Sequence, residues 1–493
     1  MPHPYQTIRD GLDFRVRSQI VIEASPVMDA QLSNLQSSTP GGDLAHTLDI
    51  AEDSSTLELL LRLCYPIANP PLNDISVEDL EIVLRAALKY DMELPVAMLA
   101  EELMRRAKHV PLSIWSVACR AGQEGVARRA AEHMLALASL DLKSFDNLTG
   151  ITAGQLYRLR EFRRLQGAVD ESFRFGVLPR TDTANGPTFP PPYTFALPGS
   201  APTPDLTLQS SDEHTYSAHR NVICMISTIL CRRINANLRH RTNKSNKSQK
   251  KHHCTRASAC IELEDAGSVL SALLAFCYRL GSSVLDTFPP STLAATIAAA
   301  NKYDMHGLLP ELRAQWALVS KREPLRSYFA AAELDLSEFA TQSARDVLRI
   351  KLDGCYLPEM EDTSAETYRR VLIYHEACQA VARTLLVPLQ LAAQPESPQS
   401  AQHPDDSPRH WRLPPTPLDL QPLGLLNEII KVYFSMAAEW PGRLELCFDS
   451  PYELATRKGL WCPSCQSSAQ KLTDLSGVLR EAPYRFSQVP FPS

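Results

Sequence analysis

Glycine is scarce in this sequence. Only 19 of the 493 residues are glycine, whereas 37 are proline. Phosphate-cradling loops and nucleophile elbows need glycine at fixed spacing, and the sequence contains no glycine-rich phosphate loop, no Gly-x-Ser-x-Gly and no His-Glu-x-x-His. The chain is therefore expected not to be an enzyme, and no catalytic or cofactor-binding residues are predicted.

Long apolar runs and a leader-like start are also lacking. No stretch reaches the ~18 uninterrupted apolar residues of a membrane-spanning helix, and residues 1–30 have no basic stretch followed by an apolar core. The twelve cysteines are scattered, which favours intracellular thiols over a disulfide framework. We expect no membrane association and an intracellular location, in the cytoplasm or the nucleus.

Neither sign of charge is in large excess. The chain has 50 basic and 56 acidic residues, and its net charge of -6 is too small to mark the whole chain as a nucleic-acid or membrane-surface binder. Apolar residues make up 44% and charged residues 22%, as in globular proteins. At roughly 100–200 residues per domain, the length allows two to four folded domains.

The sequence does contain an internal repeat. Residues 86–92 (AALKYDM) recur as 299–305 (AANKYDM), and residues 63–65 recur as 276–278, both at an offset of 213. An offset of 212 carries Thr152-Ala153 onto Ser364-Ala365. An offset that holds over roughly a hundred residues indicates a duplicated domain.

The second copy carries an insertion rich in basic residues. Residues 14–28 lie over 216–230 at an offset of 202, so eleven residues are added after that point. Residues 214–261 contain ten Lys and Arg side chains and no acidic one. Aromatic residues are not interleaved with these charges, so nucleic acid is not the favoured partner. Three interpretations stay open: a solvated loop, a nuclear-import or nucleic-acid contact, or retained non-coding sequence.

Two proline-rich stretches, 179–204 and 388–422, are predicted linkers, because proline removes backbone donors and favours extended chain. Short alternating runs at 205–208 and 214–219 predict a hairpin, residues 260–263 a third strand, and apolar-faced segments several helices. Few strands followed by many helices indicate an α+β fold. The predicted parts are repeat 1 (1–108), a helical extension (109–170), a linker (171–204), repeat 2 (205–320, with the basic insert 232–256), a second extension (321–386), a linker (387–424) and a C-terminal segment (425–493).

The order of these elements, together with two motifs, resembles a known family. The motifs are residues 54–66 (SSTLELLLRLCYP) and the Lys-Tyr-Asp-Met tetrapeptides at 89–92 and 302–305. They resemble the BTB/POZ domain of the type found in mushroom-forming fungi (basidiomycetes), over residues 8–170, 193–386 and the tail. The resemblance implies tandem BTB/POZ-like repeats, each with a small three-stranded sheet plus helices and a helical extension, and a mainly helical tail.

Two features depart from the family pattern. The first strand of the first copy, expected near residues 5–9, is predicted to be short or missing. Metazoan cullin adaptors commonly use a hydrophobic-x-Glu motif before the third strand, and neither residues 31–45 nor 235–259 supply one. A cullin ubiquitin-ligase adaptor is therefore the less favoured variant.

The sharpest chemical motif is Trp461-Cys462-Pro463-Ser464-Cys465, because a CxxC turn lets two thiolates meet one tetrahedral zinc. One CxxC supplies half a site, and Cys378 and Cys447 are candidates for the other half. The fungal family resembles this tail in its Tyr-His-x-x-Cys helix and late CxxC. The predicted metal ligands are thus Cys378, Cys447, Cys462 and Cys465, with packed thiols and a redox CxxC as the alternatives.

The leading hypothesis is a non-catalytic scaffold that recognises other proteins through BTB-like surfaces. We also expect the two repeats to pair within the chain through their first-helix segments, 20–27 and 222–230. The alternative hypothesis is a nuclear or chromatin-associated factor that uses the basic loop and a zinc-stabilised tail.

Overall fold

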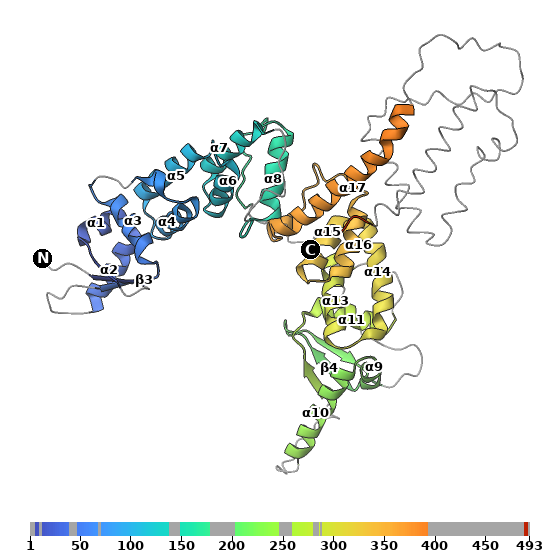
Figure 1. Cartoon of the computed structure of the whole chain (residues 1–493). Helices are drawn as coiled ribbons and strands as arrows, with labels where there is room; N and C mark the ends of the chain where they lie inside the picture. Colours follow the sequence, from blue (N-terminus) through green and yellow to red (C-terminus); the bar gives the residue numbers. More distant parts are fainter. Residues whose placement is uncertain are drawn as a thin grey trace, which may run out of the picture. The chain divides into compact units, whose positions relative to one another are not determined.

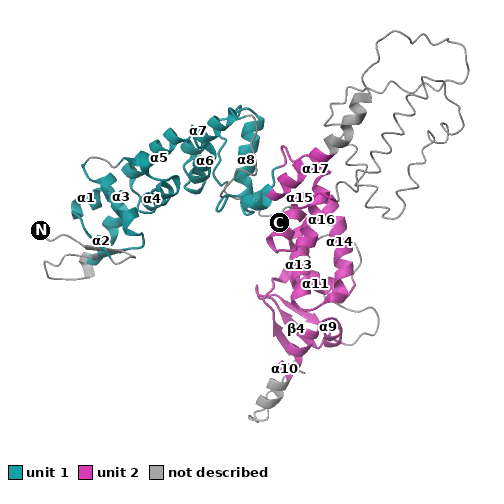
Figure 2. Cartoon of the chain, viewed as in Figure 1, with its two compact units in different colours: residues 1–181, 356–369 teal, residues 182–355, 370–493 magenta. Residues whose placement is uncertain are grey.

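The computed structural model describes residues 5–8, 12–38, 47–67, 71–137, 148–177, 203–245, 259–279, 285, 288–392 and 488–491. The chain forms two compact units, shown in Figure 2: unit 1 comprises residues 1–181 and 356–369, and unit 2 comprises residues 182–355 and 370–493. The fold is mixed α+β, mostly helical, with one small sheet in each unit. The predicted linkers, the C-terminal helix and the CxxC lie almost entirely outside the described residues.

The sheet of unit 2 has three strands, β4 (Leu206–Gln209), β5 (Thr215–Ala218) and β6 (Ala259–Glu262). Their order is β5-β4-β6, with β4 antiparallel to β5 and parallel to β6. Burial alternates along β4 and β5, as expected when one face of a strand packs on the core. The predicted hairpin and third strand are confirmed.

Unit 1 contains a sheet of the same topology, formed by β1 (Tyr5–Ile8), β2 (Asp13–Arg15) and β3 (Thr47–Ile50) in the order β2-β1-β3. The strand that was expected to be short or missing is present, and it has four residues, as does β4. The registers correspond as well. Gln6 pairs with Phe14 and Leu48, and Leu208 pairs with Tyr216 and Ile261, which matches the offsets of 202 and 213.

The helices follow one another in the same order along the chain in both units (Figure 1). In unit 1 they are α1 (Ser18–Ala24), α2 (Pro26–Ser38), α3 (Ser54–Cys64), η1 (Leu72–Asp74), α4 (Val77–Lys89) and α5 (Glu93–Arg106). In unit 2 they are α9 (Arg220–Ile226), α10 (Thr228–Ser245), α11 (Gly267–Cys277), α13 (Pro290–Lys302), η3 (His306–Leu308) and α14 (Leu309–Arg322).

The basic insertion begins inside α10, which has 18 residues against 13 in α2. Residues 246–258 of the insertion lie outside the described part of the chain. Within α10, the Asn237 side chain donates to the main-chain carbonyl of Cys260, with its Nδ2 atom 2.9 Å from the oxygen. At the offset of 202, Asn237 corresponds to Leu35 of α2, so this bond lies within the length that the two helices share, and it gives a partner to one backbone group at β6.

A helical extension follows the sheet and the helices of each unit described above. It consists of α6 (Pro111–Arg120), α7 (Glu124–Leu135) and α8 (Ala153–Arg164) in the first case, and of α15 (Pro324–Glu333), α16 (Ser337–Val347), η4 (Pro358–Glu361) and α17 (Ala365–Ala392) in the second. Pro111 and Pro324 are the first residues of α6 and α15, where a missing N–H costs no hydrogen bond.

Residues 356–369 belong to unit 1 although they come late in the sequence. Thr152 and Ser364 form an antiparallel bridge, and the neighbouring main-chain bonds run from Ala153 N to Thr363 O (2.7 Å) and from Ala365 N to Ile151 O (2.9 Å). Positions 152 and 364 are the ones that the offset of 212 makes equivalent. The bridge therefore joins the two segments that this offset relates in the sequence.

A buried ion pair accompanies this bridge. Arg158 on α8 donates from both terminal nitrogens to the Glu361 carboxylate, and the two side chains are only 7% and 5% exposed. Tyr356 also donates to Glu361, over 2.8 Å. Because desolvated charges are costly unless they are paired, this pair ties residues 356–369 to α8. The predicted second extension, residues 321–386, thus contains residues of both units.

Candidate interaction surface

The Lys-Tyr-Asp-Met motif of unit 2 forms a clamp between the end of α13 and the residues that follow β6. The Tyr303 hydroxyl donates to the Asp265 carboxylate, and Lys302 Nζ lies 3.0 Å from Glu264 and 3.3 Å from Asp265. Burial, and then the hydrogen bond to Asp265, raises the pKa of Tyr303 to about 12. The phenol therefore stays protonated and acts as a structural donor.

Unit 1 holds the same clamp. Tyr90 donates to the Glu52 carboxylate, and Lys89 Nζ lies 2.6 Å from the other Glu52 oxygen. Burial alone would raise the pKa of Glu52, but the hydrogen bonds from Lys89 and Tyr90 bring it below its usual value. Both carboxylates sit just after the third strand of their sheet. The Lys-Tyr-Asp-Met motif thus stabilises the fold in both units, because its tyrosine and lysine bind the carboxylate that follows the third strand.

The residue after each clamp tyrosine closes the helix. Asp91 and Asp304 have φ angles of +52° and +56°, in the left-handed region that ends many helices. The following N–H groups, of Met92 and Met305, then donate back to Ala87 O (2.9 Å) and Ala300 O (2.8 Å).

The short helix α9 is held at both ends. At its start, the main-chain N–H of His219 donates to the Tyr278 hydroxyl over 2.7 Å. At its end, the Ser227 hydroxyl donates to the main-chain carbonyl of Tyr303 over 2.6 Å and accepts from the N–H of Leu230 over 3.0 Å. Ser227 is fully buried. These bonds fix the orientation of α9 on the core.

The fixed helix presents an apolar face outward, which we call the α9–α10 face. It is formed by Val222, Met225 and Ile226 of α9, at the i, i+3, i+4 spacing of one helix side, and by Ile229 of the following helix α10. Met225 is 87% exposed, the largest exposure among the large hydrophobic side chains of the described residues, and the other three are half-buried. At an offset of 202, the corresponding residues of unit 1 are Ile20, Glu23, Ala24 and Val27.

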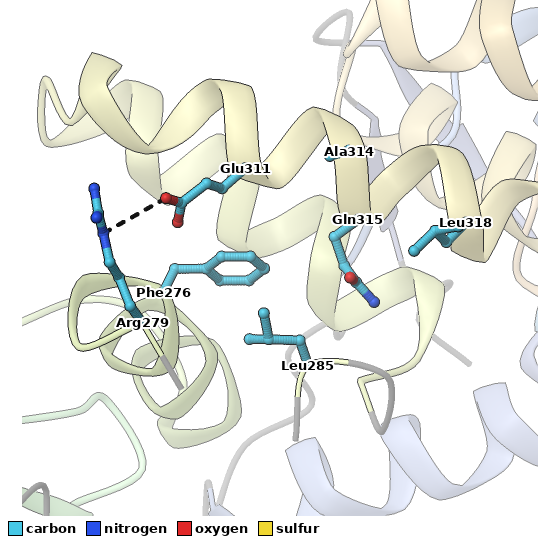
Figure 3. A pocket seen from close by; sticks show the side chains of 7 residues that line it. All are labelled: Phe276, Arg279, Leu285, Glu311, Ala314, Gln315 and Leu318. Carbon is cyan, nitrogen blue, oxygen red and sulfur yellow. Dashed lines mark ion pairs between the residues drawn. The ribbon is translucent and has the colours of Figure 1, made fainter. Parts of the chain in front are cut away.

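A cavity of about 310 Å³ lies on unit 2, between α11 and α14. Phe276, Leu285 and Leu318 give it apolar walls, and Gln315 is its polar group (Figure 3). The Arg279–Glu311 ion pair, 3.6 Å between Nε and Oε1, stands at one side (Figure 3). Its described lining is mainly apolar and fits an apolar group.

The predicted zinc ligands are only partly described. Cys378 is fully buried on α17, and burial raises the pKa of its thiol to about 11 although a hydrogen bond with Tyr374 acts in the opposite direction. Cys447, Cys462 and Cys465 lie outside the described residues. Among the described residues, no group of three or more His, Cys, Asp and Glu side chains gathers around a point. The four-cysteine site stays a prediction.

The repeated cysteines of the two units, Cys64 and Cys277, pack on helices α3 and α11, where Cys277 is buried and Cys64 is half-buried. Burial raises the pKa of Cys64 to about 11 and that of Cys277 to about 12. Both thiols are therefore protonated and unreactive at neutral pH, as expected for small apolar side chains on helix faces.

Four positioning residues were missed from the sequence: Ser227 and Asp265 in unit 2, and their counterparts in unit 1, Ser25 and Glu52. Each pair is related by the repeat offsets of 202 or 213. A comparison of polar residues between the two copies would have revealed them, because a hydroxyl or carboxylate kept at equivalent positions next to apolar segments is a candidate for a buried hydrogen bond.

Comparison with known proteins identifies one part of the chain. No helix within the described ranges is long and apolar enough to cross a membrane. No curated protein and no solved structure matches the chain. Residues 199–315 match the model of the BTB/POZ domain family, and they include all three strands of unit 2, α9 to α13 and the start of α14. Residues 199–315 are therefore a BTB/POZ domain.

Proposed function

We propose that the protein is a non-catalytic scaffold that binds other proteins through the α9–α10 face of its BTB/POZ domain. A BTB/POZ domain suggests a protein-interaction module, and the comparisons indicate no enzyme family. The observation that carries the proposal is the 87% exposure of Met225 on a helix whose two ends are fixed by buried or half-buried hydrogen bonds.

The physical argument rests on apolar area and rigidity. Burial of apolar surface is worth about 25 cal/mol per Å², and an exposed apolar cluster on a soluble fold often marks a contact site. A preorganised helix loses little conformational freedom on binding, while the flexible thioether of methionine adapts to different partners. The α9–α10 face combines both properties.

The proposal includes a second BTB-like unit, residues 1–108 with the helical extension 109–170, of the mushroom-forming fungal type. Its support is the equal strand order, the equal register and the tyrosine clamp at equivalent positions. The bridge between Thr152 and Ser364 supports a chain organised as an internal pair.

We further propose that the α9–α10 face pairs with residues 20–27 of the same chain when no other protein is bound, and that a partner protein displaces these residues. Light scattering of the full-length protein at micromolar concentration should then give the monomer mass of 54.8 kDa. A clean dimer mass would contradict this pairing, while the binding of other proteins could still hold.

The binding role is tested by a photo-cross-linking amino acid at position 225 of the full-length protein, in extracts of its own cells. We expect cross-links to a small, reproducible set of proteins or to residues 20–27. The same amino acid at Leu94, an apolar side chain of unit 1 that is 60% exposed, is the control. Equal cross-linking patterns from both positions would contradict the proposal.

A further inference from the structure

One aromatic side chain, Phe175, completes the packed core of the helical extension of unit 1. Phe175 is fully buried, with its ring centroid 6.5 Å from that of Trp115 and 5.3 Å from that of Phe162, at interplanar angles of 85° and 67°. Such edge-on arrangements place the positive ring edge against the negative face of a neighbour. Phe175 follows Phe162 by only 13 residues, so the chain turns back directly after α8 to supply it.

Unit 2 has the same aromatic site with a different occupant. Tyr328 and Tyr374 stand 213 and 212 positions after Trp115 and Phe162. The ring that packs on them is Phe491, at 5.8 Å and 68° from Tyr328 and at 5.4 Å and 62° from Tyr374. Phe491 is supplied from the C-terminal end of the chain, which lies beside α15 in Figure 1.

The two occupants are held with different strength. In unit 1, the Glu124 carboxylate accepts from the N–H groups of Phe175 (2.8 Å) and Gly176 (3.0 Å), and Arg158 donates to the Gly176 carbonyl (2.8 Å). In unit 2, the position equivalent to Glu124 is Ser337, which has no carboxylate. The carboxylate of this clamp is therefore missing at the equivalent position of unit 2, whereas the counterpart of Arg158 is Arg370.

The lower burial of Phe491 and its longer sequence distance from the ring it packs on also indicate that it is held less tightly than Phe175. Phe491 is half-buried, between an exposed Pro490 and a half-buried Val489, whereas Phe175 is fully buried. Phe491 also follows Tyr374 by 117 residues in the sequence. Closing a longer loop costs more conformational entropy. The occupant of the unit 2 site is therefore the one that can leave.

We propose that Tyr328 and Tyr374 form a peptide-binding site for an extended segment with phenylalanine one residue after proline, and that Val489–Pro490–Phe491 is its releasable intramolecular occupant. The partner is a protein segment of the same chemistry, which replaces the C-terminal residues. Both tyrosines lie outside residues 199–315, so this site is separate from the α9–α10 face and does not depend on it.

The test uses a fluorescent peptide with the sequence of residues 488–493 and the full-length protein. Because a tethered occupant competes at high effective concentration, Phe491→Ala should bind the peptide about ten-fold or more tightly than the wild type. The control variant Gln488→Ala changes an exposed side chain of the same segment and should bind like the wild type. A peptide with alanine in place of its phenylalanine should not bind.

Release of the occupant has a second readout. Cys378 is fully buried one helical turn after Tyr374, so its alkylation in the native protein should be several-fold faster in Phe491→Ala than in Gln488→Ala, as measured by peptide mass spectrometry. Failure of Phe491→Ala to bind the peptide overturns the proposal. Loss of its circular-dichroism signal also overturns it, because Phe491 would then be an obligatory core residue.

Discussion

The Ser227 hydroxyl donates to the main-chain carbonyl of Tyr303 over 2.6 Å, across 76 residues of sequence. Ser25 makes the equivalent bond to the carbonyl of Tyr90, over 2.5 Å. In each unit, one serine thus fastens the turn between the first two helices to the residue that also carries the tyrosine clamp. The orientation of the α9–α10 face depends on this bond.

Replacing Ser227 by alanine should cost about 1–3 kcal/mol of unfolding free energy, because the Tyr303 carbonyl and the Leu230 N–H lose a buried partner. Thr228→Ala removes a bond to the exposed Asp304 carboxylate and should cost less than about 1 kcal/mol. Urea unfolding of both variants measures the difference. Equal, small losses would show that the serine does not fasten α9.

The clamp predicts a loss of stability at alkaline pH. The pKa of Tyr303 is raised from 10.0 to about 12, so the folded state holds this proton more tightly than the unfolded state. Its contribution is complete below pH 10 and disappears as the pH rises from 10 to about 12. The pKa of Lys302 is likewise raised to about 12, since its bonds to Glu264 and Asp265 outweigh burial.

Tyr303→Phe removes the proton that is lost in this range. Its free energy of unfolding should therefore fall less steeply between pH 10 and 12 than that of the wild type, while being lower at neutral pH by about 1.5–3 kcal/mol. Urea midpoints at several pH values give both quantities. Parallel curves for the two proteins would show that the tyrosine is not the titrating group.

Gly154→Ala tests the assignment of residues 356–369 to unit 1. An added Cβ would lie 2.2 Å from Glu361 Oε1, so the carboxylate would have to leave Arg158. We expect a cost of about 1–3 kcal/mol. Gly125→Ala, in an exposed helix position with nothing within 4 Å of the new Cβ, should be neutral or stabilising by up to about 1 kcal/mol. A neutral Gly154→Ala would contradict the packing of Glu361 on α8.

Most strands and helices of both units were predictable because their signals are local, whereas β1 was wrongly expected to be short or missing. Alternation over a few residues predicts β4 and β5, and apolar spacing predicts α3 and α11. The repeat offsets also predicted which strands of the two sheets correspond to each other. The bridge at Thr152 and the role of Phe491 were not predictable, because a contact across 117 or 212 residues leaves no periodic pattern in the sequence.

The four-cysteine zinc site makes a separate prediction. Full-length protein purified without added metal should contain one zinc per chain by elemental analysis, because a metal can anchor a segment too small to bury its own core. Cys462→Ser should lose this zinc, whereas Cys277→Ser changes a buried thiol of the BTB/POZ domain and should keep it. Wild-type protein without zinc would exclude the site.

The central claim is that the protein acts by binding other proteins through the α9–α10 face. Quantitative affinity purification with mass spectrometry tests it most directly, with the full-length protein and two variants that each add one carboxylate to α9. Met225→Asp places the charge on the exposed apolar face, and Asn221→Asp places it on another exposed position of the same helix. We predict that a defined set of proteins is recovered with the wild type and with Asn221→Asp and is lost with Met225→Asp. Recovery of the same proteins with all three would contradict the claim.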